Sequence, residues 1–185
     1  MRIVHDIDLL GDGGAQQAFV NASLVVAAAG FVGLVALAAL GLGPATWRGW
    51  LWLAAGSLAA YVASLPVHEL IHAALFKLLG PAGTKVRFGY ERGMLYAGCP
   101  GVELPRGRFI AVLLAPLVVV SLACLVAGVA LGAPACLGAW AVFALHASGC
   151  TGDLYCVLQF LRHPQASWGR DTERGITLLA GDGGE

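Results

Sequence analysis

The chain has 185 residues, of which 58% are hydrophobic and 12% are charged. Such a composition is typical of an integral membrane protein and not of an ordinary soluble domain. The formal net charge is zero, so the chain offers no basic surface for the phosphates of a nucleic acid. At this length the chain has room for about four membrane spans in one compact domain.

The N-terminal segment 1–18 combines acidic side chains with a glycine cluster and does not resemble the start of a secretory signal. We predict that it forms a short tail. No charged residue occurs in the stretch 19–42, which is longer than the ~20 residues needed to cross the hydrocarbon core. This stretch is therefore the first predicted transmembrane helix.

The second predicted transmembrane helix, 50–79, starts among tryptophans and an arginine, as is typical of a membrane–water interface. It contains an H-E-x-x-H motif in which His68 and His72, four residues apart, lie on one helix face. Glu69 beside the first histidine can act as general base toward a metal-bound water. Histidine and glutamate are costly in hydrocarbon, so this setting favours a zinc site over an accidental or structural match.

The polar segment after this helix alternates polar and apolar side chains. We predict a β-hairpin at 84–99, with an irregular loop as the alternative. Five cysteines without C-x-x-C spacing indicate neither a disulfide framework nor a thiolate zinc site. Cys99, in this polar segment, could be a metal ligand, a zinc-displacing switch, a substrate contact or simply packed.

Two further uncharged or nearly uncharged runs predict transmembrane helices at 109–132 and 136–161, followed by a polar, glycine-rich tail at 163–185. The predicted fold is thus an all-α membrane protein with four transmembrane helices and a short hairpin between the second and third. Lysine and arginine concentrate around the hairpin and in the C-terminal tail. By the positive-inside rule, both termini and the hairpin are expected to face the cytoplasm.

Asp153 is the one charged residue between Arg108 and Arg162, and a carboxylate in such a run needs a cation or a basic partner. Counted from the predicted helix ends, Asp153 and His72 lie at a similar depth. Two histidines and a carboxylate, with one position left for water, form a hydrolytic zinc site. We therefore predict Asp153 as the third ligand, with a solvated or cavity-lining aspartate as the alternative.

His146 lies seven residues before Asp153 and so on the same helix face, together with Cys150. It could orient a zinc ligand, replace Asp153 as the third ligand, or donate a hydrogen bond in the transition state. About 10 Å of helical rise separates His146 from Asp153, so both can hardly bind one ion directly. A position in the second coordination shell, or on the wall of the cavity, is favoured.

The motif helix, the dipeptide Cys99-Pro100 and the segment Ser-Gly-Cys-Thr-Gly-Asp at 148–153 resemble a family of short bacterial membrane proteins, the putative zincin peptidases, over about residues 60–165. The motif and Gly152-Asp153 are also similar to intramembrane zinc metalloproteases of the site-2 protease class. The Asn-x-x-Pro-x-x-Asp-Gly pattern of those proteases is lacking. The resemblance implies a protein of the bacterial cytoplasmic membrane.

These observations predict a zinc metallopeptidase that cleaves a membrane-protein or peptide substrate at the cytoplasmic membrane boundary, with Glu69 as catalytic base. The hairpin could present an edge strand to an extended substrate, and lipid surrounds the spans. One alternative is a non-catalytic zinc-binding membrane protein with a structural metal or a role in metal handling. Another is a membrane scaffold without metal.

Overall fold

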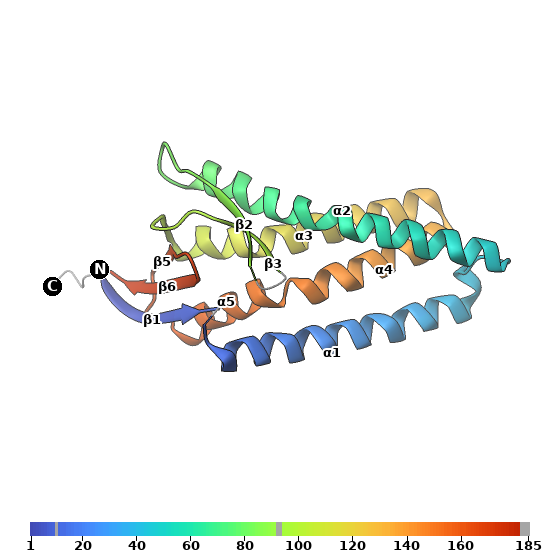
Figure 1. The fold of residues 1–185 in the computed structure, drawn as a ribbon, viewed down its shortest axis with the longest axis horizontal. Helices are drawn as coiled ribbons and strands as arrows, with labels where there is room; N and C mark the ends of the chain where they lie inside the picture. Colours follow the sequence, from blue (N-terminus) through green and yellow to red (C-terminus); the bar gives the residue numbers. More distant parts are fainter. Residues whose placement is uncertain (10, 92–93, 182–185) are drawn as a thin grey trace. The chain divides into compact units, whose positions relative to one another are not determined.

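The structure is a computed structural model that describes residues 1–9, 11–91 and 94–181 (Figure 1). In these ranges the fold is mostly helical and includes two small antiparallel sheets. The helices are α1 (Gly13–Leu37), the π-helix η1 (Ala38–Leu42), α2 (Trp47–Leu79), α3 (Arg106–Leu131), α4 (Ala133–Gly149) and α5 (Thr151–Arg162). The strands are β1 (Arg2–Asp8), β2 (Arg87–Glu91), β3 (Met94–Gly98), β4 (Glu103–Pro105), β5 (Trp168–Asp171) and β6 (Gly175–Ala180).

The contacts within the chain divide it into two compact units. The sheet unit comprises Met1–Phe19, Glu69–Pro116 and Gly152–Glu185, and the helical unit comprises Val20–His68 and Leu117–Thr151. Helices α1, α2 and α3 each contribute residues to both units, and the boundary in α2 falls between the first two residues of the H-E-x-x-H motif.

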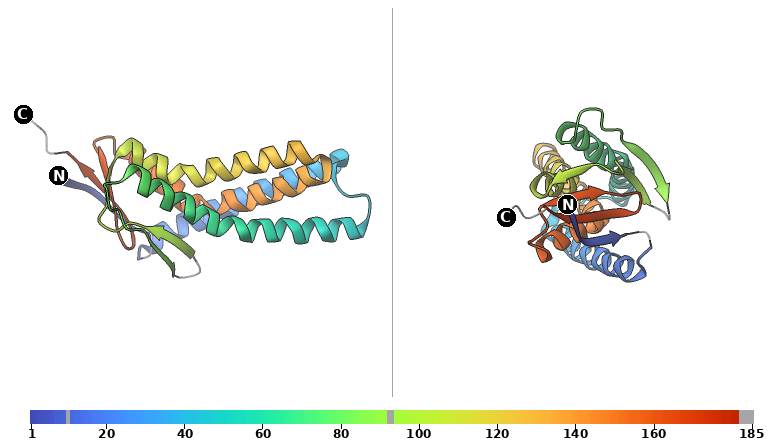
Figure 2. Two further views of the ribbon diagram at one scale, coloured as in Figure 1. Left: turned by 90° about the horizontal axis from the view of Figure 1, so that it is seen from above. Right: turned by 90° about the vertical axis from the view of Figure 1, so that its left-hand side faces the viewer.

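The sheet unit contains a four-stranded antiparallel sheet of order β1-β6-β5-β4, with β6 between β1 and β5 (Figures 1 and 2). The predicted tails 1–18 and 163–185 therefore contain three of these four strands, which the prediction of an all-α fold did not include, although the fold is mostly helical as predicted. Arg2 pairs with Ala180, so the two ends of the chain satisfy each other's backbone hydrogen bonds. Such long-range pairing ties down terminal segments that look like tails when read by local composition.

The core of the sheet unit contains three phenylalanines. The ring of Phe109 lies 6.0 Å from that of Phe76 in an edge-to-face arrangement and 5.7 Å from that of Phe160. Gly169 of β5 allows this packing, because a Cβ atom there would lie 2.7 Å from both Phe109 and Phe160. Burial of large aromatic side chains is a major source of folding free energy, so α2, α3, α5 and β5 are held together at this cluster.

The predicted hairpin is present, and its strands β2 and β3 pair from Arg87 opposite Gly98 to Glu91 opposite Met94. Its turn at 92–93 lies outside the described residues. Within the described part of the chain, β2 and β3 pair only with each other. Phe88 and Tyr90 of β2 are exposed, so this ribbon combines unpaired strand edges with aromatic side chains.

In the helical unit, segments of α1, α2, α3 and α4 run side by side (Figures 1 and 2). Helix α1 packs closely on α4, because a Cβ atom at Gly30 would lie 2.4 Å from the Cβ of Ala144. The indole Nε1 of Trp140 donates a hydrogen bond of 2.9 Å to the carbonyl of Gly30. Small residues and interhelical hydrogen bonds of this kind are the usual means by which membrane helices associate.

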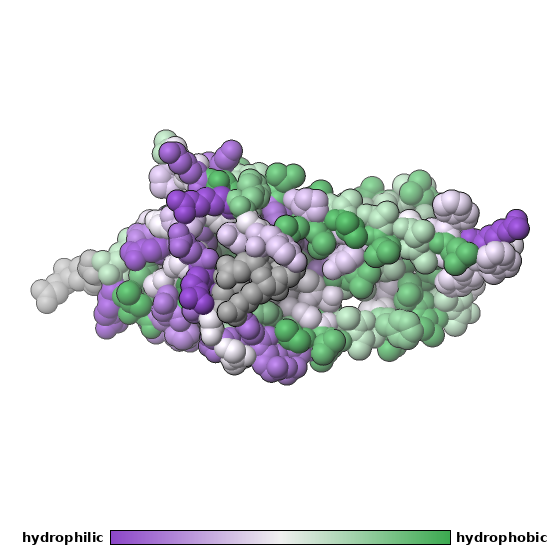
Figure 3. Space-filling model, in the orientation of Figure 1, coloured by the Kyte–Doolittle hydropathy of each residue, from purple (hydrophilic) through white to green (hydrophobic). Residues whose placement is uncertain are grey.

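Large hydrophobic side chains remain exposed on the helical unit, including Val25, Trp52 and Val129, and hydrophobic residues dominate the face of this unit in Figure 3. Among the described residues, three helical segments are long and apolar enough to cross a membrane: Gly13–Leu42, Trp47–Leu79 and Arg106–Leu131. Exposed apolar surface on such segments is expected where lipid is the solvent. The structure is therefore consistent with a membrane protein.

The predicted fourth span, 136–161, is not one continuous helix. It is interrupted at Cys150 between α4 and α5, and it counts as a fourth span only if this bent pair crosses the membrane as a unit. Glycines at 149 and 152 weaken the helix here. The hydroxyl of Thr151 donates a hydrogen bond to the carbonyl of Ser148. This bond competes with the backbone hydrogen bond that the carbonyl would accept in a regular helix.

Candidate metal centre

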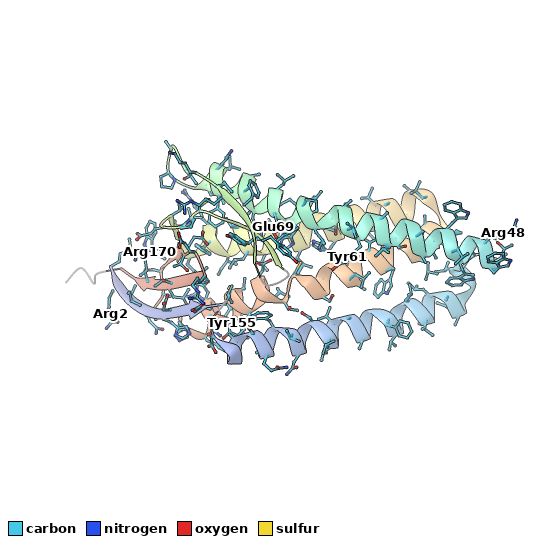
Figure 4. The ribbon with its side chains drawn as sticks, in the orientation of Figure 1. Arg2, Arg48, Tyr61, Glu69, Tyr155 and Arg170 are labelled. Carbon is cyan, nitrogen blue, oxygen red and sulfur yellow. The ribbon has the colours of Figure 1, made fainter. Side chains whose placement is uncertain are left out.

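Helix α2 carries the H-E-x-x-H motif and is uninterrupted from Trp47 to Leu79, with Pro66 inside it. His68 and His72 are therefore one helical turn apart on the same side of α2, with Glu69 between them in sequence. Figure 4 labels Glu69 on this helix. His72 is buried, and His68 and Glu69 are half-buried.

In the sheet unit, the ring of His72 lies between a backbone carbonyl and a carboxylate. Its Nδ1 is 3.0 Å from the carbonyl oxygen of Val112 in α3. A carbonyl oxygen can only accept, so Nδ1 carries the proton and donates it. In the neutral ring this leaves the lone pair on Nε2, which lies 3.4 Å from Oδ2 of Asp153. Metal-binding histidines are commonly oriented by such a hydrogen bond at their other nitrogen.

The separation of His72 and Asp153 fits two ligands of one ion better than a simple ion pair. A charge-assisted hydrogen bond would bring nitrogen and oxygen to about 2.7–2.9 Å. With zinc bonds of about 2.0–2.2 Å in a tetrahedron, a nitrogen and an oxygen ligand lie about 3.4 Å apart. The observed distance between Nε2 and Oδ2 is 3.4 Å. Imidazole and carboxylate are also donors that zinc accepts, so this pair fits the metal.

Asp153 lies in the first turn of α5, directly after the interruption at Cys150. The amino end of a helix carries partial positive charge and unpaired N–H groups, which favour a carboxylate there. The sequence had placed Asp153 deep in a continuous helix and matched its depth to that of His72. The structure does bring Asp153 to His72, but from the start of a short helix.

In the helical unit, His68 meets His146 of α4 and Cys150 at the end of that helix. Nδ1 of His68 lies 3.2 Å from Nε2 of His146, and Sγ of Cys150 lies 3.8 Å from Nδ1 of His68. His146 and Cys150 are buried, at 2% and 1% exposure. His146 is therefore a neighbour of the first histidine of the motif.

Cys99 lies in the hydrophobic core of the sheet unit at 1% exposure. Its backbone N–H donates to the carboxylate of Asp171, whose backbone carbonyl in turn accepts from Gly101. Burial, followed by the negative charge of Asp171, raises the pKa of the Cys99 thiol to about 11. Among the described residues, Cys99 is in neither of the groups of side chains that are close enough together to share a metal ion.

Sequence reasoning missed Asp171, which lies in the predicted C-terminal tail. It also missed the Val112 carbonyl, which no sequence pattern can reveal. Burial raises the pKa of Asp171 to about 7. The hydrogen bond donated by the backbone N–H of Cys99 and the nearby His72 act in the opposite direction and lower this pKa. The position of Cys150 beside His146 had a visible signal, because it follows His146 by four residues, one helical turn.

Comparison with protein families matches residues 61–168 to the family described as putative zincin peptidase. The chain belongs to this family. The match covers more than half of the chain and includes His68, Glu69, His72, His146 and Asp153. No curated protein and no solved structure matched the chain. The family description indicates a zinc-dependent peptidase, and the histidine, cysteine and aspartate groups of the structure are suitable zinc ligands.

Proposed function

We propose that this member of the zincin peptidase family is a zinc-dependent membrane peptidase in which His68, His72 and Asp153 hold the metal and Glu69 is the general base. One observation carries the proposal. His72 has its Nδ1 directed to the Val112 carbonyl, while its Nε2 lies at the tetrahedral ligand spacing from Asp153.

His68 completes the ligand set through the geometry of α2. It precedes His72 by one turn of a continuous helix and so faces the same side. When Nδ1 of His68 donates its proton to Nε2 of His146, the lone pair of His68 is left on Nε2. Both motif histidines then bind through Nε2, and His146 orients a ligand instead of acting as one.

Bound zinc supplies Lewis acidity, which lowers the pKa of a coordinated water and polarises the carbonyl of the scissile peptide. Glu69 accepts a proton from the attacking water on a carboxylate oxygen. The water oxygen bonds to the carbonyl carbon, and Glu69 then delivers the proton to the departing amide nitrogen. The amino end of α5 favours the negative charge of Asp153 throughout.

The substrate in this proposal is a membrane-protein or peptide segment cleaved at the cytoplasmic membrane boundary, with both termini of the enzyme in the cytoplasm. The unpaired edges of the β2–β3 ribbon support this, because an extended segment can add to such an edge by backbone hydrogen bonds. The exposed rings of Phe88 and Tyr90 offer apolar contacts to its side chains. The concentration of lysine and arginine around the ribbon supports the orientation.

The test is the substitution Glu69→Gln, with Glu173→Gln as matched control, since the Glu173 side chain is 74% exposed. Newly formed protein N-termini would be labelled in membranes of cells that express each variant, and the zinc content of each purified protein would be measured. We expect Glu69→Gln to keep its zinc and to abolish N-termini that the wild type and Glu173→Gln both produce. Identical N-termini in all three would leave a non-catalytic zinc protein as the better description.

A further inference from the structure

A second group of potential ligands lies within the helical unit. His146 and Cys150 are one turn apart at the end of α4, and both lie against His68 of α2. The group is buried in apolar sequence, where ionisable side chains are costly to keep without a function. The peptidase proposal uses His146 as an acceptor for His68 and gives Cys150 no role.

The distances within this group are close to those of a coordination site. With Zn–N bonds of about 2.0–2.1 Å and a Zn–S bond of about 2.3 Å, a tetrahedral ion separates its ligands by about 3.3 Å (N to N) and 3.6 Å (N to S). Nδ1 of His68 and Nε2 of His146 are 3.2 Å apart. Sγ of Cys150 lies 3.8 Å from the former atom and 4.0 Å from the latter. A contraction of a few tenths of an ångström would bring all three atoms onto one ion.

We propose that His68, His146 and Cys150 form a second metal site, with two nitrogen donors and one sulfur donor, for zinc or a softer ion such as Cd²⁺. Thiolate and imidazole together prefer such ions. Binding moves the proton of the neutral His68 ring from Nδ1 to Nε2 and releases the thiol proton of Cys150 to solvent. Three protein ligands leave one position to a small molecule, so the ion exchanges more easily than in a closed four-ligand structural site.

The second site competes with the peptidase site for His68. This competition, unlike the second site itself, rests on the proposed function. A neutral imidazole has one lone pair available to a metal. When His68 binds zinc through Nε2, its Nδ1 holds the proton that is donated to His146. An ion at Nδ1 requires that proton to move to Nε2, which then has no lone pair for zinc, so a neutral His68 ring serves one ion at a time. Excess metal therefore inhibits the peptidase by occupying the second site.

The experiment uses the full chain in detergent micelles, stripped of metal and titrated with Co²⁺ or Cd²⁺. The readout is the thiolate-to-metal charge-transfer absorption in the near ultraviolet. We expect this absorption in the wild type and in the double variant His72→Ala/Asp153→Asn, and its loss in Cys150→Ser. Cys124→Ser is the matched control, because Cys124 is a half-buried cysteine of α3 in the same unit and should keep the absorption.

Absence of the absorption from the wild type, or its persistence in Cys150→Ser, would overturn the second site. X-ray absorption of the unmutated protein loaded with excess zinc needs no substitution. A sulfur neighbour at about 2.3 Å supports the site, and a shell of nitrogen and oxygen only refutes it.

Inhibition of the peptidase by excess zinc tests the competition between the two metal sites. Excess zinc should suppress the formation of new N-termini by the wild type. The Cys150→Ser variant should be at least tenfold less sensitive to excess zinc. Equal sensitivity of the two proteins would refute competition. If instead Glu69→Gln still produces the N-termini while the thiolate absorption depends on Cys150, the peptidase proposal fails and the second metal site stands.

Discussion

The two histidines of the motif are one helical turn apart but have different neighbours. In the sheet unit, Nδ1 of His72 faces the Val112 carbonyl, which has neither a proton to lose nor a strong affinity for zinc. In the helical unit, Nδ1 of His68 faces His146 and Cys150, whose side chains are of types that bind metals. The neighbours of His72 therefore favour one tautomer, whereas those of His68 include two further potential metal ligands.

The two units also differ in how they are built. The sheet unit has a dense aromatic core around Phe109, whereas the helical unit exposes residues such as Phe31 and relies on close contacts at Gly30. A hydrophilic surface predominates over the sheet unit in the view of Figure 3, which suits a hydrolase that must admit water to Glu69 and His72. The exposed apolar surface of the helical unit is consistent with lipid as its solvent.

The largest expected effect is on zinc affinity, and it compares Asp153, the neighbour of His72, with His146, the neighbour of His68. In the proposed site, Asp153→Ala removes a zinc ligand, whereas His146→Gln removes a partner that orients His68. We expect His146→Gln to lower the zinc affinity by about 10–100-fold, as is typical of such partners, and Asp153→Ala to lower it by more. Competition with a chelator measures both affinities. The reverse order would identify His146 as the third ligand.

A smaller effect tests the different construction of the two units. Phe109→Ala opens a cavity in the aromatic core and should lower the free energy of unfolding by about 3–5 kcal/mol. Phe31 is 65% exposed on α1, so Phe31→Ala should change the free energy of unfolding by no more than about 0.5 kcal/mol. Denaturant titration in micelles measures both values. Equal losses would contradict a lipid-facing position for Phe31.

The third prediction concerns pH and the buried Asp171. Its pKa is raised by burial from 3.8 to about 7, so the folded chain binds this proton more tightly than the unfolded chain. The resulting stabilisation is complete below pH ~4 and is lost as the pH rises through ~7. Relative to the protonated state, ionisation of the buried carboxyl then costs at most about 4 kcal/mol.

Asp171→Asn keeps a carbonyl oxygen to accept from the N–H of Cys99 and removes the charge. We therefore expect the variant to melt at a higher temperature than the wild type at pH 8, and the difference to vanish at pH 4. Thermal unfolding in micelles between these pH values measures the effect. A difference independent of pH would show that ionisation of Asp171 is not its cause.

Several elements follow from local sequence alone. The α2 helix, the hairpin strands and the apolar helices depend on periodicity and hydrophobicity, which act over a few residues. The same reasoning failed for β6, although Ile176, Leu178 and Leu179 form a short apolar run typical of a buried strand. Flanking glycines and the chain end favoured a tail, because a strand is stable only when a partner is present.

The spacing of His68, Glu69 and His72 on one helix, and a lone carboxylate at Asp153, were determined by the sequence, because a helix fixes the relative directions of residues four apart. Only the tertiary structure decided what surrounds them. The Val112 carbonyl at His72, the pairing of His68 with His146 and Cys150, and the Asp171 contact at Cys99 join residues more than thirty positions apart. Contacts over such separations depend on how the helices and strands pack, and local sequence patterns do not predict that packing.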